Sequence, residues 1–285
     1  MRINFTKMHG IGNDYIYVNC MEGELPDPSG AAIKMSPRHF SVGADGLVMI
    51  CRSDIADAKM RMFNADGSEG RMCGNAIRCV GKYLYDNGIC KRKEISVETL
   101  SGIKYLTLFT DECDRVSDVI VDMGTASFSP ESIPVLTESE LVDGEVSVDG
   151  KKYKMTAVSV GNPHCVIRVD DPFVLDLEKD GPAFENNPLF PERVNTEFIS
   201  IAGDNEVKMR VWERGSGETW ACGTGACAVT AACVKNGWCK ADSPVTVHLV
   251  GGDLEIVCSS DYKITMKGPA AKAYDGVFDY EDQNK

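Results

Sequence analysis

The chain has 285 residues, a formal net charge of −13 at pH 7 and a sequence pI near 4.8. That length predicts two domains of the usual ~100–200 residues. The acidic balance argues against a nucleic-acid or anionic-membrane partner, although a small-molecule site can be locally positive inside an acidic protein. No apolar run approaches the ~20 residues of a membrane-spanning helix, and the N-terminus lacks the apolar region of a secretory leader.

The 12 cysteines favour a reducing cytoplasm over a disulfide scaffold, because the chain is long and carries no export signal. No two of them are three residues apart, so there is no Cys-x-x-Cys motif for zinc, iron–sulfur or thioredoxin-like chemistry, and no metal is expected. Six are interpreted as small buried hydrophobic residues: Cys20, Cys51, Cys90, Cys113, Cys165 and Cys258.

Strand patterns fill most of the first half of the chain. Strands are predicted over 3–8, 15–18, 47–50, 58–63, 95–99, 103–109 and 116–121, with a short helix over 30–35. A polar, glycine-containing loop leads from Asn64 to Cys73. An amphipathic helix pattern begins there and stops at Asn87-Gly88.

The second half repeats that order. Strands are predicted over 153–160, 165–169, 197–201, 207–212, 245–249, 254–257 and 264–266. Gly161–His164 reads as a turn, 172–191 as a proline-rich irregular stretch, and 213–221 as a loop leading to a second helix that begins beside Cys222. One helix among many strands in each half indicates the α+β class. The predicted domains are 1–117 and 118–267, with 268–285 returning to the first.

Several features recur 149 residues apart, which indicates an internal duplication. The matched pairs are Cys73 and Cys222, the Asn-Gly stops at 87 and 236, Gly12-Asn13 and Gly161-Asn162, and Glu69 and Glu218. Asn64 aligns with Glu213 in the same way. The chain is therefore predicted to form two pseudo-symmetric domains, each a strand-rich sheet or barrel around a central helix that starts at a cysteine.

A cysteine at a helix N-terminus lies beside backbone N–H groups without intrahelical partners and beside the positive end of the helix dipole. Such a place favours a thiolate and an anionic ligand. If Cys73 and Cys222 face each other across a cleft, one sulfur can take a proton from a carbon next to a carboxylate. The other sulfur can then return a proton to the opposite face.

Other candidate residues carry weaker signals. Arg214, next to Glu213 at a strand end, forms either a solvated ion pair or a fork on a carboxylate. Asn13, Asn64, Asn162 and Asn195 lie in predicted turns, where asparagine is common for conformational reasons alone, and His164 reads first as a structural turn residue. The G-x-G-x-x-A match at 223–228 lacks the tight βαβ context of a dinucleotide site.

The two cysteine motifs together resemble the diaminopimelate epimerase family. The resemblance rests on 64–69 leading to Met72-Cys73-Gly74-Asn75-Ala76-Ile77-Arg78-Cys79, and on 213–215 leading to Ala221-Cys222-Gly223-Thr224-Gly225. The turns at 9–14 and 161–164 fit as well. Proline racemases, a related family, carry Cys-Gly-His at the first site, whereas Asn75 follows Gly74 here.

The resemblance implies an epimerase that interconverts LL- and meso-diaminopimelate without pyridoxal phosphate or any other cofactor, for lysine and peptidoglycan precursors. It implies that Cys73 and Cys222 are the acid/base thiols and that His164 and Glu213 tune their protonation. The substrate would be held by Asn13, Asn64, Gly74, Asn75, Asn162, Asn195, Glu213, Arg214, Gly223 and Thr224. It further implies a cytoplasmic homodimer. Some members carry a glutamine that contacts substrate where this chain has Gly46.

Three alternatives remain open from the sequence. Cys73 and Cys222 could form the disulfide pair of a thiol redox or sensor protein, which would reduce disulfides and bind no amino acid. The chain could bind a nucleotide, or it could racemise another amino acid such as proline, hydroxyproline or glutamate. A substrate panel distinguishes the last of these.

Overall fold

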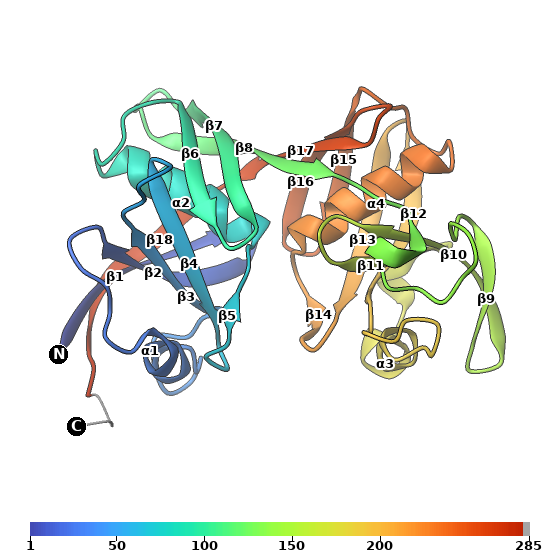
Figure 1. The fold of residues 1–285 in the computed structure, drawn as a ribbon, viewed down its shortest axis with the longest axis horizontal. Helices are drawn as coiled ribbons and strands as arrows, with labels where there is room; N and C mark the ends of the chain where they lie inside the picture. Colours follow the sequence, from blue (N-terminus) through green and yellow to red (C-terminus); the bar gives the residue numbers. More distant parts are fainter. Residues whose placement is uncertain (282–285) are drawn as a thin grey trace. The chain divides into compact units, whose positions relative to one another are not determined.

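The computed structural model describes residues 1–281 (Figure 1). The chain divides into two compact units. Unit 1 comprises Met1–Val121 together with the C-terminal segment from Gly268, and unit 2 comprises Asp122–Lys267. No helix within residues 1–281 is long and apolar enough to cross a membrane.

Unit 1 is a mixed sheet with two helices. Its elements are β1 (Arg2–Gly10), β2 (Asn13–Cys20), α1 (Pro28–Met35), β3 (Gly46–Cys51), β4 (Ala58–Asn64), β5 (Glu69–Gly70), α2 (Gly74–Asp86), β6 (Glu94–Thr99), β7 (Gly102–Thr110), β8 (Val116–Thr125) and β18 (Ala271–Asp279). The strands are ordered β18-β1-β2-β3-β4-β6-β7-β8, with β5 paired to β4. β2–β3 and β4–β6 are parallel, and the other pairs are antiparallel.

Unit 2 has the same plan. Its elements are the 3₁₀ turns η1 (Pro130–Ser132) and η2 (Pro172–Val174), β9 (Gly144–Val148), β10 (Lys151–Ser159), β11 (Pro163–Arg168), α3 (Leu177–Glu185), β12 (Asn195–Gly203), β13 (Glu206–Glu213), β14 (Gly217–Thr219), α4 (Gly223–Lys235), β15 (Pro244–Leu249), β16 (Gly252–Cys258) and β17 (Lys263–Pro269). The order is β9-β10-β11-β12-β13-β15-β16-β17, with β14 paired to β13.

The two strand orders correspond element by element, and so do their registers. Leu47 pairs with Phe63 as Thr196 pairs with Trp212, which is the 149-residue offset of the sequence. The difference is that β18 comes from the C-terminal end of the chain, whereas its counterpart β9 immediately precedes β10. The predicted α+β class with two pseudo-symmetric, strand-rich halves is confirmed.

Each cysteine-led helix is buried within its own unit. α2 buries every residue from Gly74 to Gly81, and small residues allow this, since a Cβ on Gly81 would lie 3.0 Å from Leu106 and Leu108 of β7. α4 consists mainly of alanine, glycine, cysteine and valine and buries most of its length. A helix of small side chains can be surrounded by strands without voids or collisions. The helix starts are therefore held rigidly.

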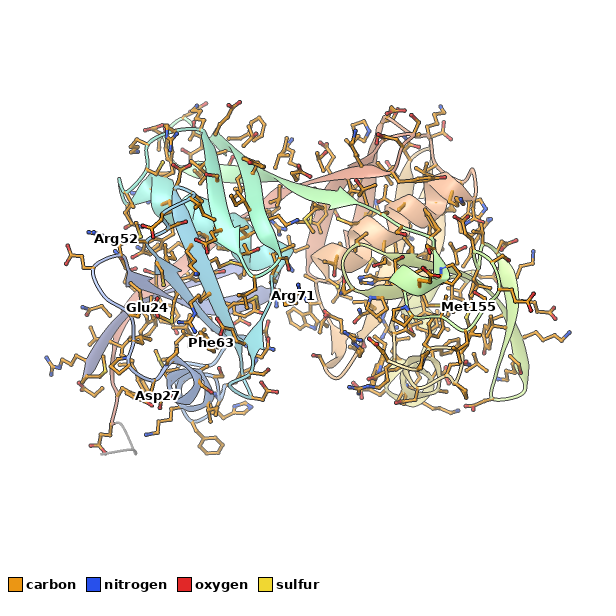
Figure 2. The ribbon with its side chains drawn as sticks, in the orientation of Figure 1. Glu24, Asp27, Arg52, Phe63, Arg71 and Met155 are labelled. Atoms are coloured by element: carbon orange, nitrogen blue, oxygen red, sulfur yellow. The ribbon has the colours of Figure 1, made fainter. Side chains whose placement is uncertain are left out.

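Separate apolar clusters form the cores. One in unit 1 packs α1 against the β2–β3–β4 strands and includes Phe63, and one in unit 2 packs α3 against β10–β13 and includes Met155. Figure 2 labels both residues among the side chains of their units. Phe63 is 4% exposed and Met155 2%, so each unit carries its own hydrophobic core.

Some predicted elements are wrong. The proline-rich stretch contains α3, which Asp176 caps at its N-terminus and which tolerates Pro182 inside it. Short strands β5, β9 and β14 and the longer β18 were not predicted, and His164 lies in β11 instead of a turn. Cys113 is exposed and Cys90 half-buried, so neither is a core residue.

Candidate functional site

Cys73 is the N-cap residue of α2, in extended conformation, and it is half-buried. Its thiol donates to the side-chain oxygen Oδ1 of Asn13 at 3.3 Å, and Nδ2 of Asn75 approaches the same oxygen at 3.3 Å. Unit 1 therefore brings Asn13 to the sulfur of Cys73 and Asn75 to Asn13. Asn64 ends β4, where its Nδ2 donates to Oγ of Ser68 inside the loop that leads to the cysteine.

A repeated ion pair fixes the hairpin before each cysteine. In unit 1, Nε of Arg61 lies 2.8 Å from a carboxylate oxygen of Glu69, four residues before Cys73. In unit 2, Nε of Arg210 lies 2.7 Å from a carboxylate oxygen of Glu218, four residues before Cys222. Each guanidinium makes a second contact to the same carboxylate, and bidentate pairs of this kind have defined geometry. Each cysteine therefore follows a two-stranded hairpin whose strands are joined by a bidentate ion pair.

Cys222 is the N-cap residue of α4 and is 5% exposed. Its Sγ accepts from the backbone N–H of Gly225 at 3.3 Å and lies 3.5 Å from Oγ1 of Thr224. The Glu213 carboxyl accepts from the hydroxyl of Thr219 and lies near enough for its negative charge to raise the pKa of the Cys222 thiol. An acid therefore lies near this sulfur, whereas the neutral acceptor Oδ1 of Asn13 contacts the sulfur of Cys73.

Burial dominates the protonation of the Cys222 site. It raises the pKa of the Cys222 thiol well above its usual value, and the negative charges of Glu213 and Glu197 raise it further. Burial also raises the pKa of Glu213, against the hydrogen bond from Thr219 and the charge of His164. The expectation that a helix N-terminus favours the thiolate is wrong for Cys222, because desolvation and two nearby acids outweigh one backbone donor.

Asn162, His164 and Glu197 are connected by hydrogen bonds, and Glu197 is not among the candidate residues identified from the sequence. Nε2 of His164 lies 2.9 Å from Oδ1 of Asn162, and Nδ1 lies 2.6 Å from Oε1 of Glu197. His164 and Glu197 are both completely buried. Glu197 stands in an apolar strand pattern, where a single carboxylate at a core-facing position was the available signal.

Asn195 and Arg214 are joined through the backbone. Oδ1 of Asn195 accepts from the N–H of Arg214 at 2.9 Å, and Nδ2 donates to the carbonyl of Pro163 at 2.8 Å. Nη1 of Arg214 donates to the carbonyl of Glu192 at 2.9 Å. Asn195 therefore anchors the β13–β14 turn in this structure, and the Arg214 side chain is half-buried beside it.

The backbone at both helix starts suits an anion. The first intrahelical hydrogen bonds are donated by Ile77 in α2 and Ala226 in α4, each at 3.0 Å. The N–H groups of Gly74-Asn75 and of Gly223-Thr224 precede these bonds, at the positive ends of the helix dipoles. Such groups can bind a carboxylate.

The backbone at Gly46 leaves no room for a side chain. A Cβ added there would lie 2.1 Å from the carbonyl oxygen of Phe63 and 3.0 Å from the ring of Tyr15. Gly46→Ala is expected to lose about 1–3 kcal/mol of unfolding free energy because the backbone of β4 must move. Urea denaturation measures this, with Gly23→Ala as the control, since its added Cβ would meet nothing within 4 Å. Equal stability of the two variants would contradict the collision.

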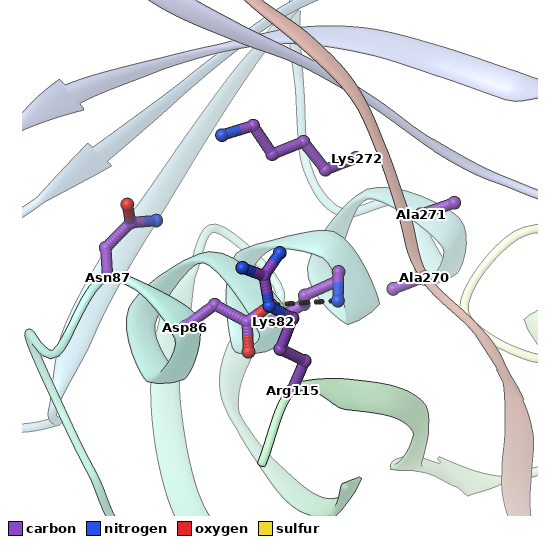
Figure 3. A pocket seen from close by; sticks show the side chains of 7 residues that line it. All are labelled: Lys82, Asp86, Asn87, Arg115, Ala270, Ala271 and Lys272. Carbon is purple, nitrogen blue, oxygen red and sulfur yellow. Dashed lines mark ion pairs between the residues drawn. The ribbon is translucent and has the colours of Figure 1, made fainter. Parts of the chain in front are cut away.

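A pocket of about 530 Å³ lies in unit 1 at the end of α2 remote from Cys73 (Figure 3). It is lined by Lys82, Asp86, Asn87, Arg115, Ala270, Ala271 and Lys272. Lys82 is paired with Asp86 at 2.8 Å. Because none of the candidate residues lines this pocket, it is separate from the cysteine site. Among residues 1–281, no group of His, Cys, Asp and Glu is arranged to hold a metal ion.

Comparisons with known proteins agree on one family. A family profile described as diaminopimelate epimerase matches residues 5–129 and 156–273. Diaminopimelate epimerase from Agathobacter rectalis is 51% identical, covering 97% of this chain and 99% of its own length. The enzyme of the same name from Acetivibrio thermocellus is 52% identical, covering 98% and 100%.

Solved structures share the fold at lower identity. A hydroxyproline epimerase from Agrobacterium vitis gives a TM-score of 0.71 at 14% identity, covering 97% of this chain and 91% of its own. A phenazine biosynthesis protein of the PhzF family from Bacillus anthracis gives 0.70 at 17% identity, covering 98% and 100%. At such identities the likeness establishes the fold alone.

Proposed function

The chain belongs to the diaminopimelate epimerase family, and on that premise we propose a two-thiol mechanism for its reaction. The enzyme interconverts LL-2,6-diaminopimelate and meso-2,6-diaminopimelate. Inverting one α-carbon requires a base on one face and an acid on the other. Cys73 and Cys222 take these two roles, and the roles exchange with the direction of reaction. The observation that carries the proposal is the duplicated N-cap cysteine, at the start of α2 and of α4.

The carboxylate on the reacting carbon binds the backbone N–H groups of Gly74-Asn75 and Gly223-Thr224. Removing the α-proton places negative charge on that carboxylate, and preorganised donors stabilise charge as it develops. Each helix end supplies such donors without a metal or a carbonyl cofactor. Their effect is large only where water is excluded, since fixed dipoles act most strongly at low dielectric.

The rest of the substrate is held by side chains around the two cysteines. Asn13, Asn64, Asn162, Asn195 and Arg214 bind the substrate, including its distal amino acid end, and Arg214 supplies a positive charge for a carboxylate. Glu213 lies near the Cys222 thiol, whose pKa its charge raises, and binds substrate. Glu213 and His164 also tune the protonation of the thiol.

The cellular location and the oligomeric state form a further part of the proposal. We propose that the enzyme acts in the cytoplasm as a homodimer and supplies precursors for lysine and peptidoglycan. All 12 cysteines are free thiols, which suits a reducing compartment. Sedimentation velocity tests the dimer, and a monomer at micromolar concentration would overturn it.

Incubation in deuterium oxide is expected to place deuterium at the substrate α-carbon as the LL and meso forms equilibrate, with no pyridoxal phosphate added. Mass spectrometry and NMR of recovered diaminopimelate measure the incorporation. Proline, hydroxyproline and glutamate serve as controls and are expected to remain unlabelled. Labelling of one of these in place of diaminopimelate would reject the substrate assignment.

A further inference from the structure

Asn13 and Asn162 occupy matching positions in the two units, but their side-chain amides are hydrogen-bonded through opposite atoms. Each follows a glycine in the left-handed region, Gly12 with φ 87° and Gly161 with φ 100°. A side chain at that φ would be strained, so the two turns present their asparagines on similar backbones. What differs is the partner that fixes each amide.

In unit 1, Asp45 holds Asn13 by its nitrogen. Nδ2 of Asn13 donates to Oδ2 of Asp45 at 2.7 Å. The other Asp45 oxygen lies 2.7 Å from the guanidinium of Arg38, which also pairs with Asp14. With its nitrogen on the carboxylate, Asn13 presents Oδ1, an acceptor, to the thiol of Cys73.

In unit 2, the His164–Glu197 pair holds Asn162 by its oxygen. Glu197 Oε1 lies against the first turn of α4, since a Cβ on Gly225 would be 2.9 Å from it. Nδ1 of His164 contacts the same oxygen at 2.6 Å, which leaves Nε2 directed at Asn162. Nε2–H then donates to Oδ1 of Asn162, and Nδ2 faces Oγ1 of Thr224 at 3.4 Å.

We propose that Asp45 and Glu197 are positioning residues that orient the two amides oppositely, so that one half-site presents an acceptor beside its sulfur and the other a donor. The orientation itself does not depend on the reaction; its catalytic consequence rests on the proposed function of the two cysteines. A substrate amino group meets an acceptor at Asn13, and a carboxylate or thiolate meets a donor at Asn162. Asp45 and Glu197 touch no reacting atom and act only through the amides.

The same substitution at both asparagines tests the orientation without an activity assay. Asn13→Asp places a carboxylate against Asp45, close to Asp14 and with Lys7 and Arg38 as the nearby cations. Asn162→Asp places one against the protonated Nε2 of the His164 ring, with Glu197, Glu213 and the Cys222 thiol nearby. We expect the melting temperature of Asn13→Asp to lie at least about 5 °C below that of Asn162→Asp at pH 8.

The difference should shrink as the pH falls toward 4. Two adjacent carboxylates cannot both ionise cheaply, so one of them binds a proton more tightly in the folded Asn13→Asp protein than in the unfolded chain. The decrease in the melting temperature of Asn13→Asp is therefore present at high pH and disappears on acidification. Asn→Leu at both positions is the uncharged control. Equal melting temperatures for the two aspartate variants, or the reverse order, would overturn the proposal.

Exchanging the partners provides a rescue. Asn13→Asp combined with Asp45→Asn restores one carboxylate–amide pair and is expected to regain most of the lost melting temperature. Arg38→Gln, which removes only the ion pairs, is the matched control. If the double variant is no more stable than Asn13→Asp alone, the contact between residues 13 and 45 does not fix the amide.

Histidine-ring ¹⁵N NMR reports the unit 2 arrangement directly. The chain has four histidines, and the His164 signals are identified by their loss in His164→Gln. Nε2 of His164 is expected to carry a proton, because it faces the acceptor oxygen of Asn162 at 2.9 Å, and Glu197→Gln is expected to shift the ring signals. Thr196→Val, a neighbouring buried change on β12, should leave the signals unaltered. An unprotonated Nε2 in the parent protein would contradict the proposed orientation of the Asn162 amide, whatever the enzymatic activity.

Discussion

Replacing Cys73 or Cys222 by alanine is expected to lower the interconversion of LL- and meso-diaminopimelate by at least about 10³-fold. Each sulfur supplies one of the two proton transfers that inversion requires, and alanine can neither accept nor donate a proton. The rate is measured from the approach to equilibrium between the two isomers, by chromatography on a chiral phase. Unimpaired turnover in one of these variants would reject the two-thiol mechanism.

Each variant should also retain a partial reaction on one isomer. The remaining sulfur can still remove and return the proton on its own face, so deuterium enters without inversion. Cys73→Ala and Cys222→Ala should therefore label opposite isomers. Cys227→Ala, a buried thiol within α4, is the matched control and is expected to lose some stability but keep turnover close to the parent rate. Labelling of the same isomer by both variants would place the two thiols on one face of the carbon.

The second large effect is expected for Glu213→Gln, which should lower kcat/KM by about 10²-fold or more while stabilising the fold. The glutamine is nearly isosteric but cannot exchange a proton with the Cys222 thiol. It also removes a half-buried charge whose desolvation is the main reason that the pKa of Glu213 is raised. Steady-state kinetics and thermal melting of the same preparations measure the two effects.

The sign of the pH dependence follows from that raised pKa. The folded parent holds the Glu213 proton more tightly than the unfolded chain does, so ionisation costs folded-state stability only above the ordinary pKa of a glutamate, near 4.3. The stability advantage of Glu213→Gln should therefore be absent near pH 4 and grow as the pH rises through the folded pKa of Glu213. Glu206→Gln, an exposed change at the other end of β13, should show neither effect. If Glu213→Gln were more stable than the parent protein by the same amount at every pH, ionisation of the Glu213 carboxyl would not be the cause of the difference.

Much of the fold could be predicted because the duplication reinforced each weak signal. The 149-residue spacing that joins Cys73 to Cys222 is also the spacing between the ladder pairs Leu47–Phe63 and Thr196–Trp212. Both helices begin directly after their cysteines, as the glycine and apolar spacing indicated.

The missed features depend on tertiary contacts. α3 was hidden by Pro182, which lies inside the helix, while Asp176 caps its N-terminus and Phe184 packs in the core. Glu197 and Asp45 could not be singled out, because their roles exist only once β12 and the β2–β3 region bring them to His164 and Asn13. The raised pKa of Cys222 likewise arises from burial, which local sequence does not report.

The unequal partners of Asn13 and Asn162 bear on how the two halves diverged. Asp45 aligns with Val194, and Glu197 aligns with Val48, so neither acid has an acidic counterpart in the other half. An ancestor made of two identical copies would have held both amides the same way and would have met a symmetric ligand best. His164 also aligns with Tyr15, so the partners of both amides differ between the copies and the two half-sites can hold the reacting and distal ends of one ligand differently.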